Sequence, residues 1–151
     1  MNKLRCRGIR GAATVEHNTR ESIVAASKEL LQQMIQVNKV DVDDIAAVWF
    51  TTTPDLTAEF PAVAARELDW SNAALLCGHE MNVPGSLPGC LRILMLVNTE
   101  RESEELLHVY LKGTEALRTE TGSNKICSSL WKWAPAMETS PRSPDALNLL
   151  A

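Results

Sequence analysis

The stretch Ile45-Ala-Ala-Val-Trp-Phe-Thr-Thr-Thr53 gives the strongest indication of the fold class of this chain. It is apolar and rich in β-branched residues, and it does not alternate between apolar and polar positions. Such a run predicts a β-strand that is covered on both faces. Acidic residues precede it and Pro54-Asp55 ends it. We therefore expect a sheet with material packed on both sides.

The segments before this strand predict another strand and the clearest helix of the chain. Basic and apolar residues alternate at the start of Leu4–Val15, which is typical of a strand. Asn18 and Glu21 have the spacing of a capping box, and Asn38 is a suitable left-handed helix end. Between these ends, apolar residues recur at helical spacing: Ile23, Leu30, Leu31, Met34 and Ile35.

The segments after the strand predict a short helix and three more strands. Pro61 is well placed to begin a helix that ends at Leu68. Ala73–Cys77 predicts a short strand, and glycines and prolines mark Gly78–Cys90 as a loop. Leu91–Val97 predicts a buried strand and His108–Leu111 a shorter one.

This order of elements predicts an α+β (mixed α/β) fold, with a single mixed β-sheet and helices on one face. One long helix covers only one face, so a second copy of the chain is the economical cover for the other. We expect residues 1–118 to form this domain and residues 119–151 to be a largely mobile tail. Trp131 and Trp133 are unusual in such a tail; contact with the domain or a neighbouring subunit and simple chance are both open explanations.

Composition excludes several classes of function. The 151 residues include 15 Lys and Arg against 19 Asp and Glu, which gives a net charge of −4 without any cationic cluster. Nucleic acids and anionic membranes are therefore not expected partners. The longest apolar stretch, Ile45–Phe50, is far shorter than the ~20 residues of a membrane span. The start lacks an apolar signal segment and the four cysteines are far apart, so we expect reduced thiols in a cytoplasm.

Polar residues at strand ends are the candidates for chemistry. Arg10 follows the first strand, Cys77 and Glu80 follow the fourth element, and Arg92 opens an otherwise apolar strand. An arginine there needs a partner, because burial of an unpaired charge is costly. Two explanations stay open at this point: Arg92 pairs with Glu80 for structure alone, or both belong to a site.

Two other kinds of chemistry are weakly supported. A zinc site built from Cys77, His79 and Cys90 lacks a fourth ligand and suitable spacing. A Cys77 nucleophile with His79 as its base has no third group to orient the base. Fixed cations, one carboxylate and apolar walls remain, and this combination suits a small dianion.

Several blocks of sequence resemble one family, the trimeric α/β class of monofunctional chorismate mutases. The match runs in order from about Arg7 to Arg118. The matching blocks are Arg7-Gly-Ile-Arg-Gly-Ala-Ala-Thr-Val-Glu-His-Asn18, Thr53-Pro-Asp-Leu-Thr-Ala-Glu-Phe-Pro-Ala62, Cys77-Gly-His-Glu-Met-Asn-Val-Pro-Gly85, Cys90-Leu-Arg92 and His108-Val-Tyr-Leu111.

The resemblance implies a homotrimer that forms a pseudo-α/β-barrel, with each active site between two neighbouring subunits. It also implies the pericyclic rearrangement of chorismate to prephenate, in phenylalanine and tyrosine biosynthesis, without cofactor or metal. The partners expected are therefore chorismate, prephenate and two further copies of the chain. An alternative with the same fold is a non-catalytic trimer that binds a small acid or anchors a partner.

The resemblance also assigns roles to residues. Arg92 would stabilise the charge on the ether oxygen, and Arg10 and Tyr110 would bind a carboxylate. Glu80 would accept a hydrogen bond from the ring hydroxyl, with Cys77 beside it. The remaining substrate contacts are apolar walls and cations near the mouth: Phe60, Leu76 and Leu117, and Arg66 and Arg118.

Some of these residues also have ordinary structural explanations, and two positions depart from the family. Tyr110 is also typical of a core residue, Phe60 of a helix start, and Arg66 and Arg118 of surface charges. The family often has lysine at the position of Val63, so we expect weaker capture of the ring carboxylate here. Where the family continues with Pro-Asp, this chain has Thr119-Glu120.

Overall fold

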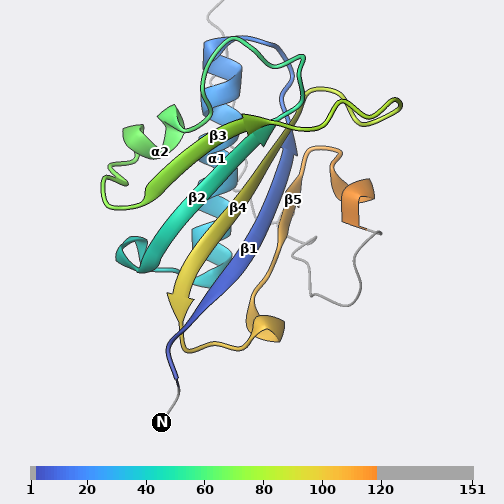
Figure 1. The fold of residues 1–151 in the computed structure, drawn as a ribbon. Coiled ribbons are helices and arrows are strands. Elements are labelled where there is room, and N and C mark those ends of the chain that lie inside the picture. Colours follow the sequence, from blue (N-terminus) through green and yellow to red (C-terminus); the bar gives the residue numbers. More distant parts are fainter. Residues whose placement is uncertain (1–2, 119–151) are drawn as a thin grey trace, which may run out of the picture.

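The computed structural model describes residues 3–118, and the predicted tail with Trp131 and Trp133 lies outside this part of the chain. Five strands form one mixed sheet in the order β3-β2-β4-β1-β5 (Figure 1). The strands are β1 (Arg5–Thr14), β2 (Ile45–Thr52), β3 (Ala74–His79), β4 (Cys90–Thr99) and β5 (Val109–Leu111). The expected α+β sheet is confirmed, and every predicted strand is present.

Two helices complete the described fold, α1 (Arg20–Asn38) and α2 (Val63–Glu67). Three short 3-10 turns, η1 (Val42–Asp44), η2 (Ser103–Glu105) and η3 (Glu115–Arg118), join or follow the strands. The long helix α1 crosses one face of the sheet, behind the strands in Figure 1, and α2 packs beside it.

Apolar side chains of α1 and of the strands form the core between helix and sheet. Ile23, Leu30, Leu31 and Met34 are fully buried on α1, which confirms their helical spacing. They pack against strand residues that face the helix. Gly11 allows this close approach, since a Cβ there would lie 2.5 Å from the Met34 sulfur and 3.1 Å from a Leu30 methyl.

Both predicted ends of α1 are wrong by one residue. Thr19, not Asn18, is the N-cap, and its side chain accepts a hydrogen bond from the Ser22 backbone at 3.2 Å. Asn18 instead accepts from the backbone nitrogens of Thr57 and Ala58, both at 2.9 Å, so its oxygen binds a distant loop.

At the other end of α1 the left-handed residue is Lys39, with φ of 49°. The predicted residue, Asn38, is the last helical residue and is buried. Its side chain donates to Met34 O and Leu107 O and accepts from Leu107 N. The Asn38 side chain therefore joins α1 to the segment at Leu107, and the helix ends one residue later than predicted.

Two further boundaries shift. The short helix begins at Val63, because Pro61 and Ala62 form the turn that precedes it. Strand β3 continues through Gly78 to His79, so the loop begins at Glu80 instead of Gly78.

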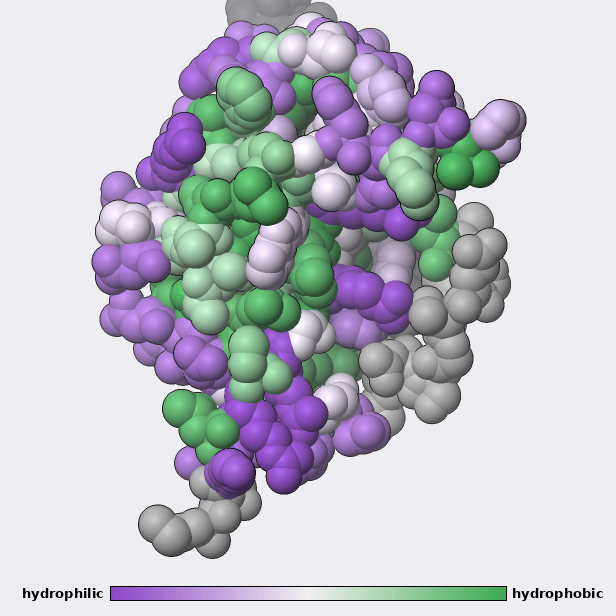
Figure 2. All heavy atoms as spheres, in the orientation of Figure 1, coloured by the Kyte–Doolittle hydropathy of each residue, from purple (hydrophilic) through white to green (hydrophobic). Residues whose placement is uncertain are grey.

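Within one chain, β2 is covered on one face only, which corrects the expectation for the isolated strand. Val48 and Phe50 are fully buried beneath α1, whereas Trp49 between them is 37% exposed on the opposite face. We call the side of the sheet away from α1 the open face. Figure 2 shows hydrophobic side chains gathered over the middle of this face.

Candidate functional site

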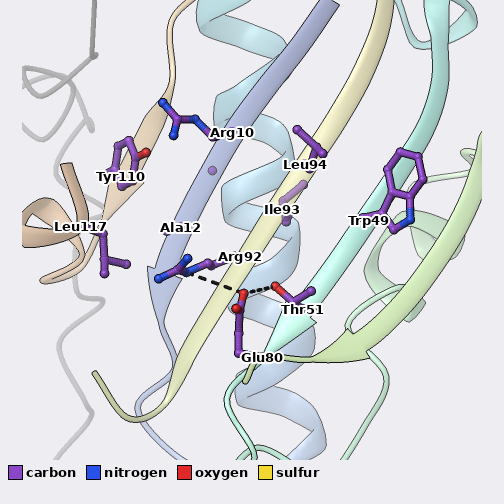
Figure 3. Close-up of a pocket in the computed structure, with 11 residues that line it drawn as sticks. Arg10, Ala12, Trp49, Thr51, Glu80, Arg92, Ile93, Leu94, Tyr110 and Leu117 are labelled. Atoms are coloured by element: carbon purple, nitrogen blue, oxygen red, sulfur yellow. Dashed lines mark hydrogen bonds and ion pairs between the residues drawn. The ribbon is translucent and has the colours of Figure 1, made fainter. Parts of the chain in front are cut away.

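A hollow of about 640 Å³ lies on the open face of the sheet, which is within the size range of small-molecule sites. Strands β1, β2, β4 and β5, the residue after β3 and the η3 turn all contribute to it (Figure 3). Its walls combine two arginines and one carboxylate with apolar side chains. The lining residues are Arg10, Gly11, Ala12, Trp49, Thr51, Glu80, Arg92, Ile93, Leu94, Tyr110 and Leu117.

Strand register brings the polar residues together. Arg92 on β4 pairs with Ala12 on β1 and with Thr51 on β2. Register partners in a sheet project from the same face, so Arg92 and Thr51 are neighbours on the open face. One step along the strands, Leu94 lies between Arg10 and Trp49 in the same way. Alternation along β1 and β4 therefore places both arginines in one hollow.

Glu80 faces Arg92 across the hollow. Its carboxylate oxygen Oε1 lies 3.7 Å from Arg92 Nε, an ion pair longer than a good hydrogen bond. The Arg92 side chain is 48% exposed and that of Glu80 is 28% exposed. A structural pair that merely neutralises a buried charge would be enclosed, so this geometry favours a binding role for both groups.

A buried histidine holds the backbone of Arg10 in place. The Arg10 backbone nitrogen donates to His108 Nδ1 at 3.0 Å, and His108 is 4% exposed. Burial, and then the charge of Arg10, lowers the pKa of His108 from its ordinary value of 6.5. The imidazole is therefore neutral at pH 7 and able to accept this bond.

Tyr110 and Leu117 form the wall beside β1, and Figure 3 shows Trp49 on the opposite side of the hollow. Tyr110 is 9% exposed, so it is both nearly buried and part of the lining.

A second hollow of about 410 Å³ contains two other predicted site residues, Phe60 and Cys77. Cys77 pairs with Phe50 in register, so its side chain projects to the helix-covered side and away from Arg92. Burial raises the pKa of the Cys77 thiol, and a backbone hydrogen bond at Ala62 and the charge of Arg66 offset this in part. A protonated thiol is a weak nucleophile, which agrees with the poor sequence support for a Cys77 nucleophile.

The other predicted contacts also lie away from the first hollow. Leu76 is 58% exposed and is the register partner of Trp49, so it extends the apolar surface of the open face. Arg66 is exposed on α2, and Val63 at the start of α2 packs partly against the core. The side chain of Arg118 lies outside the described part of the structure.

One protomer thus brings together five of the predicted residues and separates four others from them. Arg10, Glu80, Arg92, Tyr110 and Leu117 line the first hollow. Phe60 and Cys77 line the second hollow, Arg66 is near Cys77, and Leu76 lies on the open face.

Sequence reasoning missed Thr51, Trp49 and Leu94 in the first hollow. Thr51 donates a hydrogen bond to Glu80 Oε1 at 2.5 Å. Trp49 and Thr51 were missed because the sequence predicted that both faces of this strand are buried. The one available signal was that they occupy alternate positions of the strand and so share a face.

Over residues 3–118, no three His, Cys, Asp or Glu side chains are grouped so that they would hold a metal ion. In the same part of the chain, neither helix combines the length and the apolar character needed to cross a bilayer.

Comparison with known proteins adds independent information. Residues 6–121 match the family described as chorismate mutase type I. The chain is 46% identical over 118 residues to "Chorismate mutase AroH" from Thermus thermophilus, across 78% of this chain and 97% of the relative. It is 41% identical over 120 residues to "Chorismate mutase AroH" from Bacillus subtilis (strain 168), across 79% and 94%.

Structural comparison agrees with the sequence. A chorismate mutase from Clostridium thermocellum superposes with a TM-score of 0.71 and 47% identity, covering 72% of this chain and 97% of that one. The family match spans most of the chain and includes every residue that lines the first hollow. The chain therefore belongs to the chorismate mutase type I family.

Proposed function

We propose that this chorismate mutase isomerises chorismate to prephenate at a site that two neighbouring protomers share. The observation that supports a shared site is the separation of the predicted residues within one chain. The arginines and Glu80 lie in the first hollow, whereas Phe60 and Cys77 lie in the second. A neighbour that covers the open face would place its second hollow against the first hollow of this chain.

The composition of the open face supports this assembly. Trp49, Leu76 and Leu94 are 37%, 58% and 39% exposed, and strand register makes them one contiguous apolar stripe. Apolar patches of this kind mark association surfaces in soluble proteins. We propose a closed trimer, in which each open face is covered by the other two copies. This chain would then form the pseudo-barrel that its family resemblance implies.

The first hollow suits a substrate with two carboxylates. Arg10, with the Tyr110 hydroxyl, would bind the side-chain carboxylate, and Glu80 would accept a hydrogen bond from the ring hydroxyl. Trp49, Leu94 and Leu117 would enclose the compact conformer, in which the enolpyruvyl side chain lies over the ring. Holding this conformer moves the entropic cost of the reaction into the binding step.

Arg92 is the proposed catalytic cation. As the carbon–oxygen bond breaks, negative charge grows on the ether oxygen, and a fixed guanidinium stabilises that charge more in the transition state than in the ground state. Arginine is always charged and offers several donors in a fixed plane. The long, half-exposed contact with Glu80 leaves Arg92 able to bind substrate oxygen atoms. No cofactor or covalent intermediate is proposed.

At the rim, Val63 would supply no charge for the ring carboxylate, so Arg66 and Arg118 are the proposed cations there. A cytoplasmic location with reduced cysteines also stays our prediction.

Subunit complementation tests the shared site. Arg92→Ala removes a residue of the first hollow, and Arg66→Glu reverses a charge near the second. We expect each variant alone to form inactive trimers, because every site lacks one half. Refolding the two together should restore about a quarter of the wild-type activity, since an intact site needs one particular half from each neighbour.

Loss of chorismate absorbance measures the activity, and sedimentation equilibrium measures the mass of each preparation. The control is an affinity tag on the Arg92→Ala chains alone, since recovery of untagged Arg66→Glu chains with them shows that mixed trimers have formed. Mixed trimers without recovered activity would place the whole site in one protomer, and an active monomer would contradict the assembly.

A further inference from the structure

Glu80 needs an anchor beyond its own backbone. Glu80 follows β3 directly, and its backbone nitrogen donates to Thr52 O at 2.9 Å. This bond fixes the position of the Glu80 backbone. The side chain has three further rotatable bonds and is 28% exposed. Its 3.7 Å ion pair with Arg92 is too long to hold the carboxylate in one orientation.

Thr51 supplies that anchor. Its hydroxyl donates to Glu80 Oε1 at 2.5 Å, and this is the same oxygen that faces Arg92 Nε (Figure 3). Hydrogen bonds to a charged carboxylate are among the stronger ones in proteins. Thr51 is itself rigid, because it is β-branched and lies in β2 between its register partners Gly78 and Arg92.

The two oxygens of Glu80 are consequently not equivalent. Oε1 carries both the hydrogen bond and the ion pair, while no hydrogen bond to Oε2 occurs among residues 3–118. A carboxylate oxygen without a protein donor, at the edge of a binding hollow, is able to accept a hydrogen bond from a bound molecule.

We propose that Thr51 is a positioning residue of the active site: it holds Glu80 Oε1 so that Oε2 accepts the hydrogen bond from the substrate ring hydroxyl. This inference depends on the binding role proposed for Glu80. The hydroxyl group of Thr51 acts only through Glu80 and does not itself touch the substrate. Since the ring hydroxyl takes no part in bond making or breaking, its hydrogen bond strengthens ground state and transition state alike.

The test compares a substitution at Thr51 that removes the hydroxyl group with one that keeps it. Thr51→Val replaces the hydroxyl with a methyl group and keeps the shape of the side chain, and we expect KM to rise roughly tenfold while kcat changes less than about threefold. Thr51→Ser keeps the hydroxyl, and KM should return to within about threefold of the wild-type value. Thr99→Val is the matched control: it removes a hydroxyl that accepts from Arg101 N elsewhere in the sheet, and both constants should stay unchanged.

A double-mutant cycle with Glu80→Ala separates positioning from general damage to the strand. In the Glu80→Ala background, Thr51→Val should change kcat/KM by less than about twofold, because there is no carboxylate left to orient. An equal loss in both backgrounds, or failure of Thr51→Ser to restore KM, would overturn the role of Thr51.

The cycle also distinguishes this inference from the role of Glu80 on which it depends. If Glu80→Ala lowers kcat/KM and Thr51→Val does not, only the role of Thr51 is wrong. If Glu80→Ala itself leaves kcat/KM unchanged, the binding role of Glu80 fails and the positioning role of Thr51 fails with it.

Discussion

The two faces of the sheet are made by the same strands but do different work. On the helix-covered face, Ile9, Phe50 and Met95 are fully buried beneath α1. On the open face, Trp49 and Leu94 remain more than a third exposed and lie beside the charged groups of the first hollow. Since side chains alternate along a strand, strands such as β2 and β4 contribute one set of residues to the core and another to the first hollow.

Apolar character alone does not reveal which face of the sheet a strand residue occupies. Trp49 and Phe50 are neighbours in sequence and both are aromatic, yet only Phe50 is buried within one chain. The covered face is completed by a helix of the same chain, so its packing is settled as the monomer folds. The open face has polar groups among its apolar residues and is completed, in our proposal, by other copies.

The largest effect that we expect comes from the open face. Arg92→Lys keeps the positive charge but removes the planar set of donors, and we expect kcat to fall by at least ~10³-fold. Initial rates of chorismate loss measure kcat and KM. Arg5→Lys is the control, since Arg5 lies on β1 in an exposed ion pair with Glu102, and its kcat should stay within about twofold. A lysine variant that kept a tenth of wild-type kcat would contradict the role of Arg92.

An effect of intermediate size is expected when a methyl group is added to each face of the sheet and the free energy of unfolding is measured. Gly11→Ala inserts a methyl group 2.5 Å from the Met34 sulfur on the covered face, which should cost about 1–3 kcal/mol of unfolding free energy. On the open face, a Cβ at Gly8 meets only Leu94 and Leu96, no closer than 3.4 Å, so Gly8→Ala should change stability by less than about 0.5 kcal/mol. Urea denaturation at one protomer concentration measures both variants.

The stability of Gly8→Ala reports whether another protomer packs on the open face at this point. A small change means that the open face has room at this point of the assembly. A loss as large as that of Gly11→Ala would mean that another protomer packs directly over Gly8.

The smallest effect concerns His108, the buried residue that accepts the hydrogen bond from the Arg10 backbone. Because the pKa of His108 is lowered in the folded protein, folding favours the neutral imidazole. Above pH 6.5 its full contribution is present; as the pH falls below 6.5, the unfolded chain binds a proton first and the free energy of unfolding decreases. The decrease ends once the pH is below the folded-state pKa.

His108→Asn isolates the contribution of His108 protonation to the pH dependence of stability. The amide oxygen still accepts from Arg10 N but does not titrate. Urea denaturation between pH 7.5 and 5 should show a smaller loss of stability in His108→Asn than in the wild type. Carboxylates titrate equally in both proteins and cancel in the difference. Parallel curves for the two proteins would show that His108 does not contribute.

The wrong helix ends of α1 illustrate what local patterns miss. Asn18 and Asn38 are good capping residues, and either would serve in an isolated helix. In the folded chain their amides bind the backbone at Thr57 and Leu107, far away in sequence. At the N-terminus, the Thr19 side chain caps the helix in place of Asn18. At the C-terminus, Asn38 stays helical and buried with its tertiary hydrogen bonds, and Lys39 adopts the left-handed backbone instead.

The order of strands and helices, the buried apolar residues of α1 and the charged residues of the first hollow could all be predicted from the sequence. These follow from periodicity and from residue type, which act over a few neighbours along the chain. The three-dimensional fold was needed to show that Thr51 contacts Glu80, that Cys77 projects away from Arg92, and that Trp49 lies on the open face. Strand pairing fixes these relations between distant segments, and a single residue of register moves a side chain from one face of the sheet to the other.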